Sequence, residues 1–238
     1  MKTLREFIEL TEGISKPVPM SFVKKAMDSA RSTIVGKPIT PPNLAKAVEK
    51  ALGRKFGVKT TIKYASALQG GDMSANAYYD QEDDLEGKRP VEVELLFSPL
   101  DKKGIDIDNE GFDELSMGMA KDVVHELLHK HQAIKRSFVE PRPFTVKRVT
   151  DPKIQKAQEY LGKSDEIEAY GHNIALELLR SYGSRKNALT ALRNFVRIPP
   201  DKSPDMYAYL VAFGMDQNHS VLKKLVKKVI LYLKELEK

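Results

Sequence analysis

The stretch that decides the fold is Asp122-Val-Val-His-Glu-Leu-Leu-His-Lys-His131. It places His125 and His129 four residues apart, and residues at that spacing lie on one face of a helix, so both imidazoles can reach one metal ion. Glu126 follows the first histidine and can contact a water bound to that ion without itself coordinating it. The stretch therefore predicts a helix that carries two metal ligands and a general base.

Periodic apolar residues indicate that this helix is long and covers residues 113–135. The apolar positions are Leu115, Met119, Val123 and Leu127. Upstream, β-branched or alternating segments predict three strands, and Pro42 is placed to open a helix before them. These upstream elements are a helix at 42–53 and strands at 58–65, 74–80 and 90–97.

Further helices are expected on both sides of these segments, at 3–12, 20–32, 164–182, 187–196, 205–215 and 219–236. Residues 136–163 include three prolines and are expected to be mostly loop. Ser164 is a suitable N-cap for the helix that follows, because its hydroxyl can accept a backbone hydrogen bond. Strands and helices are thus segregated along the chain, which favours an α+β fold.

The composition is ordinary for a soluble protein, and it limits the metal chemistry. The chain has 238 residues, 41% apolar and 30% charged, and no apolar run reaches the roughly 18 residues needed to cross a membrane. Its start lacks the apolar core of an export signal, so we expect a cytoplasmic protein. There are no cysteines, so a zinc ion would have to be bound by histidine and carboxylate side chains.

A catalytic zinc ion usually has three protein ligands and one position open to water, so a third ligand is needed. His131 lies only two residues after His129, about 200° around the helix, and points away. The expected helix at 164–182 supplies the remaining candidates, which are Asp165, Glu166, Glu168 and His172.

A helical wheel separates the two glutamates of that helix. Glu168 falls within the apolar arc, whereas Glu166 falls on the opposite side, in the first turn. A carboxylate on an apolar face is costly unless it is paired or bound to a metal, so Glu168 is the predicted third ligand. The alternative is a buried ion pair between Glu168 and an arginine or lysine.

These residues resemble the gluzincin clan of zinc metallopeptidases. Several of its families carry Glu-x-x-Ala-Asp-x-Phe-Ala-x-Glu-Leu-Leu after a His-Glu-x-x-His helix, and this chain has Glu168-Ala-Tyr-Gly-His-Asn-Ile-Ala-Leu-Glu-Leu-Leu179. The resemblance covers residues 113–182 and also selects Glu168. His172 departs from it, because those families have Asp or Asn there to orient a metal-binding histidine. His172 could accept the same hydrogen bond, or it could be a fourth ligand or a gate.

The resemblance implies a minimal zincin core of a helix, a small antiparallel or mixed sheet, the His-Glu-x-x-His helix and the glutamate helix. In that fold an edge strand binds the peptide by strand addition, a role that strand 90–98 or strand 74–80 could fill. We therefore expect a metallopeptidase core at 37–183. An N-terminal helical arm or propeptide would precede it at 1–36, and a helical extension would follow at 184–238.

The expected function is zinc-dependent hydrolysis of peptide bonds, with a protein or peptide as the partner. One Zn²⁺ ion held by His125, His129 and Glu168 would lower the pKa of its bound water to about 7 and polarise the scissile carbonyl. Glu126 would act as the general base and pass the proton to the leaving amine. An oxyanion donor is also expected, and the candidates are Tyr170, His172, Tyr207, Tyr209 and His219.

A second interpretation is a catalytically silent protein with a zinc-stabilised core. Residues 1–7 and 222–233 resemble the ends of uncharacterised proteins of tailed bacteriophages. That resemblance implies a phage particle component or a host-protein binder, in the host cytoplasm or the virion. In a zymogen, residues 16–19 or their neighbours would block the site.

Basic residues raise a third interpretation, nucleic-acid binding. Lys223, Lys224, Lys227 and Lys228 form a cluster at helical spacing, and Arg142, Lys147 and Arg148 lie elsewhere in the chain. Such patches bind phosphates without sequence preference and in a salt-sensitive way. No nucleic-acid motif accompanies them, so a solvated helix face is the simpler interpretation.

Overall fold

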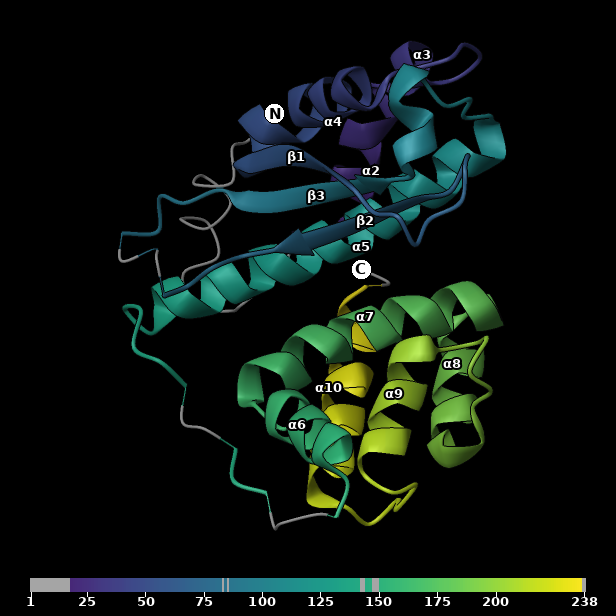
Figure 1. The fold of residues 1–238 in the computed structure, drawn as a ribbon. Helices are drawn as coiled ribbons and strands as arrows, with labels where there is room; N and C mark the ends of the chain where they lie inside the picture. The colour runs from purple at the N-terminus through teal and green to yellow at the C-terminus, as the bar shows by residue number, and fades with distance from the viewer. Residues whose placement is uncertain (1–17, 83, 85, 142–143, 147–149, 237–238) are drawn as a thin grey trace. The chain divides into compact units, whose positions relative to one another are not determined.

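The chain divides into two compact units, Met1–Val139 and Glu140–Lys238, each with its own hydrophobic core. The computed structural model describes residues 18–82, 84, 86–141, 144–146 and 150–236. The strands lie in the first unit, and the described part of the second unit is helical (Figure 1). The chain therefore has the α+β class that its sequence predicts, and each unit is described by itself.

The first unit contains a mixed three-stranded sheet with the order β1-β3-β2. Its strands are β1 (Val58–Tyr64), β2 (Met73–Tyr78) and β3 (Val91–Phe97), close to the three predicted segments. β1 runs parallel to β3, whereas β2 runs antiparallel to it. β3 is therefore the central strand, and β1 and β2 form the edges of this sheet.

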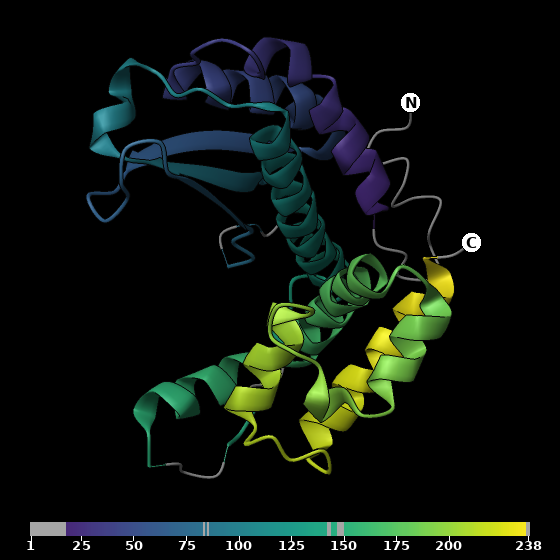
Figure 2. The ribbon, with the colours of Figure 1, turned by 90° about the vertical axis from the view of Figure 1, so that its right-hand side faces the viewer.

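One face of the sheet packs against helices. Alternate residues of β3 are buried, namely Val91, Val93, Leu95 and Phe97. Helices α2 (Met20–Asp28), α4 (Pro41–Phe56) and α5 (Asn109–Lys135) contribute to the same core, and Figure 2 shows α5 passing beside the strands. The other face has polar side chains such as Glu94 and Lys63, which form a 4.0 Å ion pair. A sheet with one solvated face shows this alternation.

α5 contains both histidines and begins at Asn109 rather than at the expected residue 113. Asp108 is its N-cap, and the Asp108 carboxylate accepts a 2.8 Å hydrogen bond from the backbone N–H of Gly111. This bond satisfies one of the donors that a helix N-terminus leaves without a partner, so the helix can start a turn earlier.

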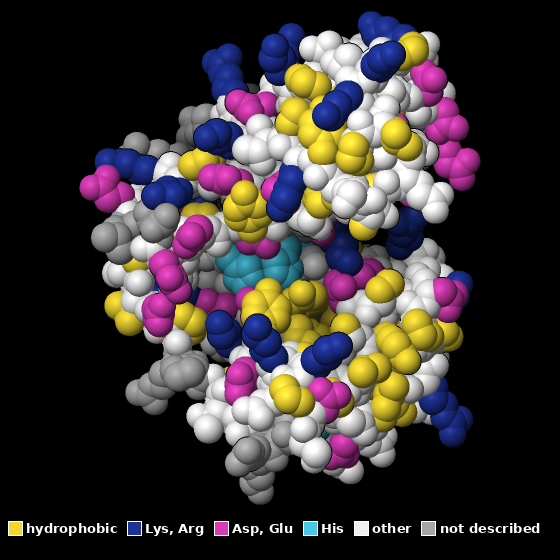
Figure 3. Space-filling view, viewed as in Figure 1, with side chains coloured by type: hydrophobic (Ala, Val, Ile, Leu, Met, Phe, Trp, Pro, Cys, Tyr) yellow, Lys and Arg dark blue, Asp and Glu magenta, His cyan; other side chains and the backbone are white. Residues whose placement is uncertain are grey.

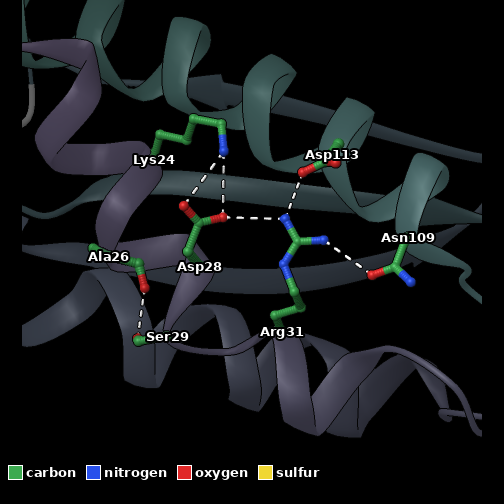
Figure 4. A network of polar contacts seen from close by, with 7 residues as sticks. All are labelled: Lys24, Ala26, Asp28, Ser29, Arg31, Asn109 and Asp113. Atoms are coloured by element: carbon green, nitrogen blue, oxygen red, sulfur yellow. Dashed lines mark hydrogen bonds and ion pairs between the residues drawn. The ribbon is translucent and has the colours of Figure 1, made fainter.

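Ion pairs join the N-terminal helices to the first turns of α5 (Figure 4). The guanidinium of Arg31, at the start of α3 (Arg31–Ile34), donates to the Asp113 carboxylate and, at 3.3 Å, to the side-chain oxygen of Asn109. Arg31 also pairs with Asp28 of α2, which in turn pairs with Lys24. The described residues before α4 therefore belong to the same unit as α5.

The described helices of the second unit are α6 (Pro152–Leu161), α7 (Ser164–Tyr182), α8 (Arg185–Leu192), α9 (Pro204–Ala212) and α10 (Ser220–Glu235). α7 and α10 share its core. They approach closely at Gly171, where an added Cβ would lie 2.7 Å from the Cβ of Lys228. The absence of a side chain at Gly171 is therefore what allows these two helices to contact.

Some sequence expectations differ from the structure. Residues 136–163 are not mostly loop, because α6 forms within them: Pro152 occupies its first turn and the Asp151 carboxylate accepts from the backbone N–H of Lys153 at 2.8 Å. Ser164 is the first residue of α7 rather than its N-cap, which is Lys163. The helix expected at 3–12 lies outside the described residues.

The chain divides after Val139. The functional domain limits expected after residues 36 and 183 stay predictions. α2 and α3 share a core with the sheet, and α7 shares one with α8, α9 and α10. Whether residues 1–36 are a propeptide stays a prediction. Within the part of the chain that the structure describes, no helix combines the length and apolar character that crossing a membrane requires.

Candidate metal centre

The imidazoles of His125 and His129 point toward one another from successive turns of α5. Their Nε2 atoms lie 3.0 Å apart, and the rings meet edge to face with centroids separated by 4.7 Å. Two nitrogens bound to one tetrahedral zinc ion at 2.0–2.1 Å would be about 3.3 Å apart. The pair therefore needs only a small adjustment to share an ion.

Gln132 fixes one of these rings and was not identified from the sequence. Its side-chain Oε1 lies 3.0 Å from His129 Nδ1. A histidine that donates from Nδ1 presents the lone pair of Nε2 to a metal, and such outer partners fix the tautomer and the ring orientation. The signal that could have found Gln132 is its spacing, because residues three apart on a helix are neighbours.

Glu126 is held at the end of an edge strand. Its Oε2 accepts a 2.9 Å hydrogen bond from the backbone N–H of Tyr79, the residue that follows β2. Glu126 and His129 are both partly exposed, and histidine side chains are visible at the surface in Figure 3. The Glu126 carboxylate is therefore fixed next to the histidine pair, at the end of β2.

The two glutamates of α7 do not have the environments that the helical wheel predicts. Glu168 is partly exposed, pairs with Lys228 at 3.3 Å and accepts a 3.2 Å hydrogen bond from the hydroxyl of Tyr232. This is the ion pair considered as the alternative for Glu168. Glu166, placed on the polar side by the wheel, is only 7% exposed.

The wheel fails here because it assumes a single buried arc. The buried residues of α7 are Glu166, Ile167, Ala169, Gly171, His172, Asn173, Ile174, Ala175 and Leu178, which surround much of the helix. Among the described residues, the buried His125 and Glu166 and the partly exposed His129 form a candidate ligand group that could hold one metal ion.

The candidate oxyanion donors all belong to helices of the second unit or their caps. His172 is fully buried and packs edge to face on Tyr232, with ring centroids 5.2 Å apart. Tyr209 is also fully buried; its ring contacts that of Tyr170 at 5.5 Å, and burial raises the pKa of its hydroxyl.

The other two candidates have different surroundings. His219 caps α10 by accepting from the backbone N–H of Val221 at 3.3 Å, and its ring packs on Phe213. Tyr207 is 39% exposed on α9. The packing of His172, Tyr209 and His219 gives each of them a structural role. Tyr207 is the one residue of the five that is exposed.

A buried charged cluster, also missed by the sequence analysis, lies beside His129. Lys130 and Asp84 are 7% and 2% exposed, and the Lys130 Nζ atom lies 3.9 Å from Asp84 Oδ2. Lys130 also donates to the backbone carbonyl of Arg89 and lies over the ring of Tyr79. Asp84 accepts from the Tyr79 hydroxyl at 2.8 Å and from the backbone N–H of Lys88 at 2.7 Å.

The pKa values of this cluster reflect its burial. Burial lowers the pKa of Lys130, and the charge of Asp84 offsets this only in part. Burial alone would raise the pKa of Asp84, but hydrogen bonds from the backbone of Arg89, from Tyr79 and from the backbone of Lys88 lower it, as does Lys130. Asp84 is therefore ionised at neutral pH. Its ion pair with Lys130 connects the segment after β2 to α5.

Comparison with models of protein families, with curated proteins and with solved structures gives no match. The function has to be argued from the residues of the site.

Proposed function

We propose that this protein is a zinc-dependent metallopeptidase whose metal is held by His125 and His129 of α5 and by Glu166 of α7. The observation that carries the proposal is the 3.0 Å separation of the two histidine Nε2 atoms, with Glu126 next to them at the end of an edge strand. Two imidazole nitrogens and one carboxylate oxygen are the ligand set of one class of catalytic zinc sites. A zinc ion there would polarise a carbonyl group and acidify a bound water.

Glu166 is preferred to Glu168 as the third ligand on two grounds. Its carboxylate is buried and belongs to the candidate ligand group. Glu168 is engaged by Lys228 and Tyr232 within its own unit. The resemblance to gluzincins instead selects Glu168. Zinc binding by variants of the two glutamates therefore distinguishes the two assignments of the third ligand.

In this mechanism Glu126 takes the proton from the attacking water and delivers it to the leaving amine. A carboxylate has two oxygens and can accept several hydrogen bonds, so the bond from Tyr79 fixes its orientation without using up its capacity. That orientation keeps Glu126 beside the histidine pair rather than in the metal coordination shell.

The peptide would lie along β2. Of the two strands that the sequence left open for this role, 90–98 corresponds to β3, which is paired on both sides. β2 is an edge strand that contacts α5, and it is followed directly by Tyr79, whose backbone N–H donates to Glu126. A peptide that pairs with β2 would present its backbone to the site by strand addition.

The test combines metal analysis with cleavage of a denatured protein such as casein. Zinc should bind at one equivalent, and His125→Ala and His129→Ala should lose it, whereas His131→Ala, a matched change on the same helix, should retain it. Glu166→Gln should weaken zinc binding and Glu168→Gln should not. Glu126→Gln should keep the zinc and lose cleavage by a factor on the order of 10²–10⁴. Undiminished cleavage by Glu126→Gln would exclude the mechanism.

A catalytically silent zinc protein is the second candidate, because the hydrogen bond from Tyr79 also gives Glu126 a purely structural role. The same experiments distinguish the two functions. Stoichiometric zinc binding with loss of thermal stability on chelation, and no cleavage of denatured protein or peptide libraries, would favour the silent protein.

A further inference from the structure

A cleft of about 430 Å³ lies in the first unit, between β2 and the first half of α5. Its size falls in the range of sites that take small ligands or peptide side chains. The lining comes from β2, from the segment 105–108 that leads into α5, and from the face of α5 that precedes the histidines. Neither the metal centre nor the buried Asp84 cluster contributes to it.

The cleft has an apolar floor and an acidic rim. The floor consists of Met73, Ala75, Ile105, Ile107, Leu115 and Met119. The rim carboxylates are Asp106, Asp108, Glu114 and Asp122, and no lysine or arginine is among the lining residues that the structure describes. Asp106 and Glu114 are exposed to solvent. An apolar surface edged by negative charge complements a side chain with a long aliphatic stem and a cationic end, as in lysine and arginine.

Gly118 keeps the cleft open on the α5 side. A Cβ added at this residue would meet no atom within 4 Å, so the space next to the helix is empty. Gly118 lies inside a helix, where glycine is destabilising relative to alanine by roughly 0.5–1 kcal/mol. The backbone conformation there suits other residues, which makes Gly118 a position from which the cleft can be filled.

The distance from the cleft to Glu126 can be worked out along α5 and, separately, along β2 to Tyr79. Eight residues of α5 separate Gly118 from Glu126, which is about 12 Å along the helix axis. Four residues separate Ala75 in the cleft from Tyr79, whose N–H bonds Glu126, which is about 13 Å along an extended chain. The agreement means that an extended peptide beside β2 would reach from Glu126 to the cleft in about four residues.

We propose that the cleft binds a lysine or arginine side chain of a peptide paired with β2, about four residues from the bond placed at Glu126. The stem of that side chain contacts Met73 and Met119, and its charge is met by Glu114 and Asp106 on the rim. The inference rests on the proposed function in taking a peptide as the occupant. It does not depend on zinc or on cleavage.

Peptide binding to the Glu126→Gln protein tests the inference separately from catalysis. The probe is a fluorescent ten-residue peptide with one arginine at the fifth position and otherwise alanine, serine and threonine. The same peptide with citrulline, a neutral analogue of arginine, or with glutamate serves for comparison. Fluorescence anisotropy should give binding about tenfold tighter for arginine than for citrulline, with glutamate weakest.

Variants locate the binding site. Glu114→Gln combined with Asp106→Asn should abolish the preference for arginine, and Gly118→Leu should weaken binding of both peptides by filling the cleft. Glu110→Gln is the matched control. Glu110 lies on α5 one turn before Glu114 and does not line the cleft, so this variant removes a nearby charge without changing the cleft. Circular dichroism checks that Gly118→Leu is folded, and the charge variants test the inference even if it is not.

Equal binding of the arginine and citrulline peptides, or no binding of either, would overturn the inference. So would an equal loss in the Glu110→Gln control, which would indicate a general effect of charge. Retention of arginine-selective binding in a protein without zinc or cleavage would support this inference while the proposed function failed. Cleavage by the wild-type protein without any preference for arginine would support the proposed function and overturn this inference.

Discussion

Replacing Lys130 with methionine tests whether the buried Asp84–Lys130 pair stabilises the first unit. Methionine keeps the aliphatic stem of the side chain and removes the ammonium group. Asp84 would then be a buried carboxylate without its countercharge, at 2% exposure, and the carbonyl of Arg89 would lose a donor. Removing one partner of a buried ion pair typically costs 3–5 kcal/mol.

The lower end of that range applies here. Asp84 would keep its hydrogen bonds from Tyr79 and from the backbone of Lys88, and the 3.9 Å separation from Lys130 is long for an ion pair. We therefore expect the free energy of unfolding to fall by about 3 kcal/mol. The midpoint temperature should fall by about 6–12 °C.

Urea unfolding followed by far-ultraviolet circular dichroism measures this change, and the chain has no tryptophan that could serve instead. The matched control is Lys50→Met, an exposed lysine of α4, which should change stability by less than about 0.5 kcal/mol. In a double-mutant cycle with Asp84→Asn, the double variant should be more stable than the sum of the single effects predicts.

The pH dependence gives a second measure of the same pair. The pKa of Asp84 is lowered in the folded protein, so its contribution to stability is fully present above the ordinary aspartate pKa of about 3.9 and is lost as the pH falls through the folded value. Without Lys130 that pKa rises and the loss begins at higher pH. If Lys130→Met is as stable as the Lys50→Met control, or if the two mutations at 84 and 130 are simply additive, the pair does not stabilise this unit.

Three further predictions concern single contacts. Gly171→Ala should destabilise the second unit by about 1–3 kcal/mol, because its Cβ would overlap that of Lys228, whereas Gly118→Ala should not destabilise; thermal melts of both variants check this. Gln132→Ala should weaken zinc binding by about 10–100-fold by releasing the His129 ring, as measured by competition with a chelator, and unchanged affinity would contradict that role. Asp108→Ala should cost about 1 kcal/mol by removing the N-cap of α5, and a loss below 0.3 kcal/mol in urea unfolding would refute it.

The features that follow local rules could be predicted from the sequence. The spacing of His125 and His129 fixes which way their rings point once a helix forms, and the apolar periodicity predicts that helix. The β-branched and alternating segments likewise locate the strands to within about two residues, as is usual for pattern-based boundaries. The order of the strands in the sheet could not be predicted in this way, because it depends on which strand edges pair and not on any one segment.

The features that depend on packing could not be predicted. The burial of Glu166 reflects neighbours that cover α7 on more than one side, and a helical wheel contains no information about them. Asp84 lies in a charged segment that resembles a solvated turn, and only its contact with Lys130, far along the chain, makes it a buried ion. Gln132 is intermediate, since its spacing from His129 is local but the hydrogen bond between the two side chains is seen only in the structure.

The hydrogen bond from Tyr79 to Glu126 has a consequence for how this site tolerates substitution. Because the donor is a backbone N–H, replacing the tyrosine ring with any side chain other than that of proline leaves the donor in place. Alanine scanning would therefore miss this contact, although it orients the proposed general base. Such substitutions would instead disturb the buried cluster, because the Tyr79 hydroxyl donates to Asp84. Only proline at position 79 would remove the donor to Glu126.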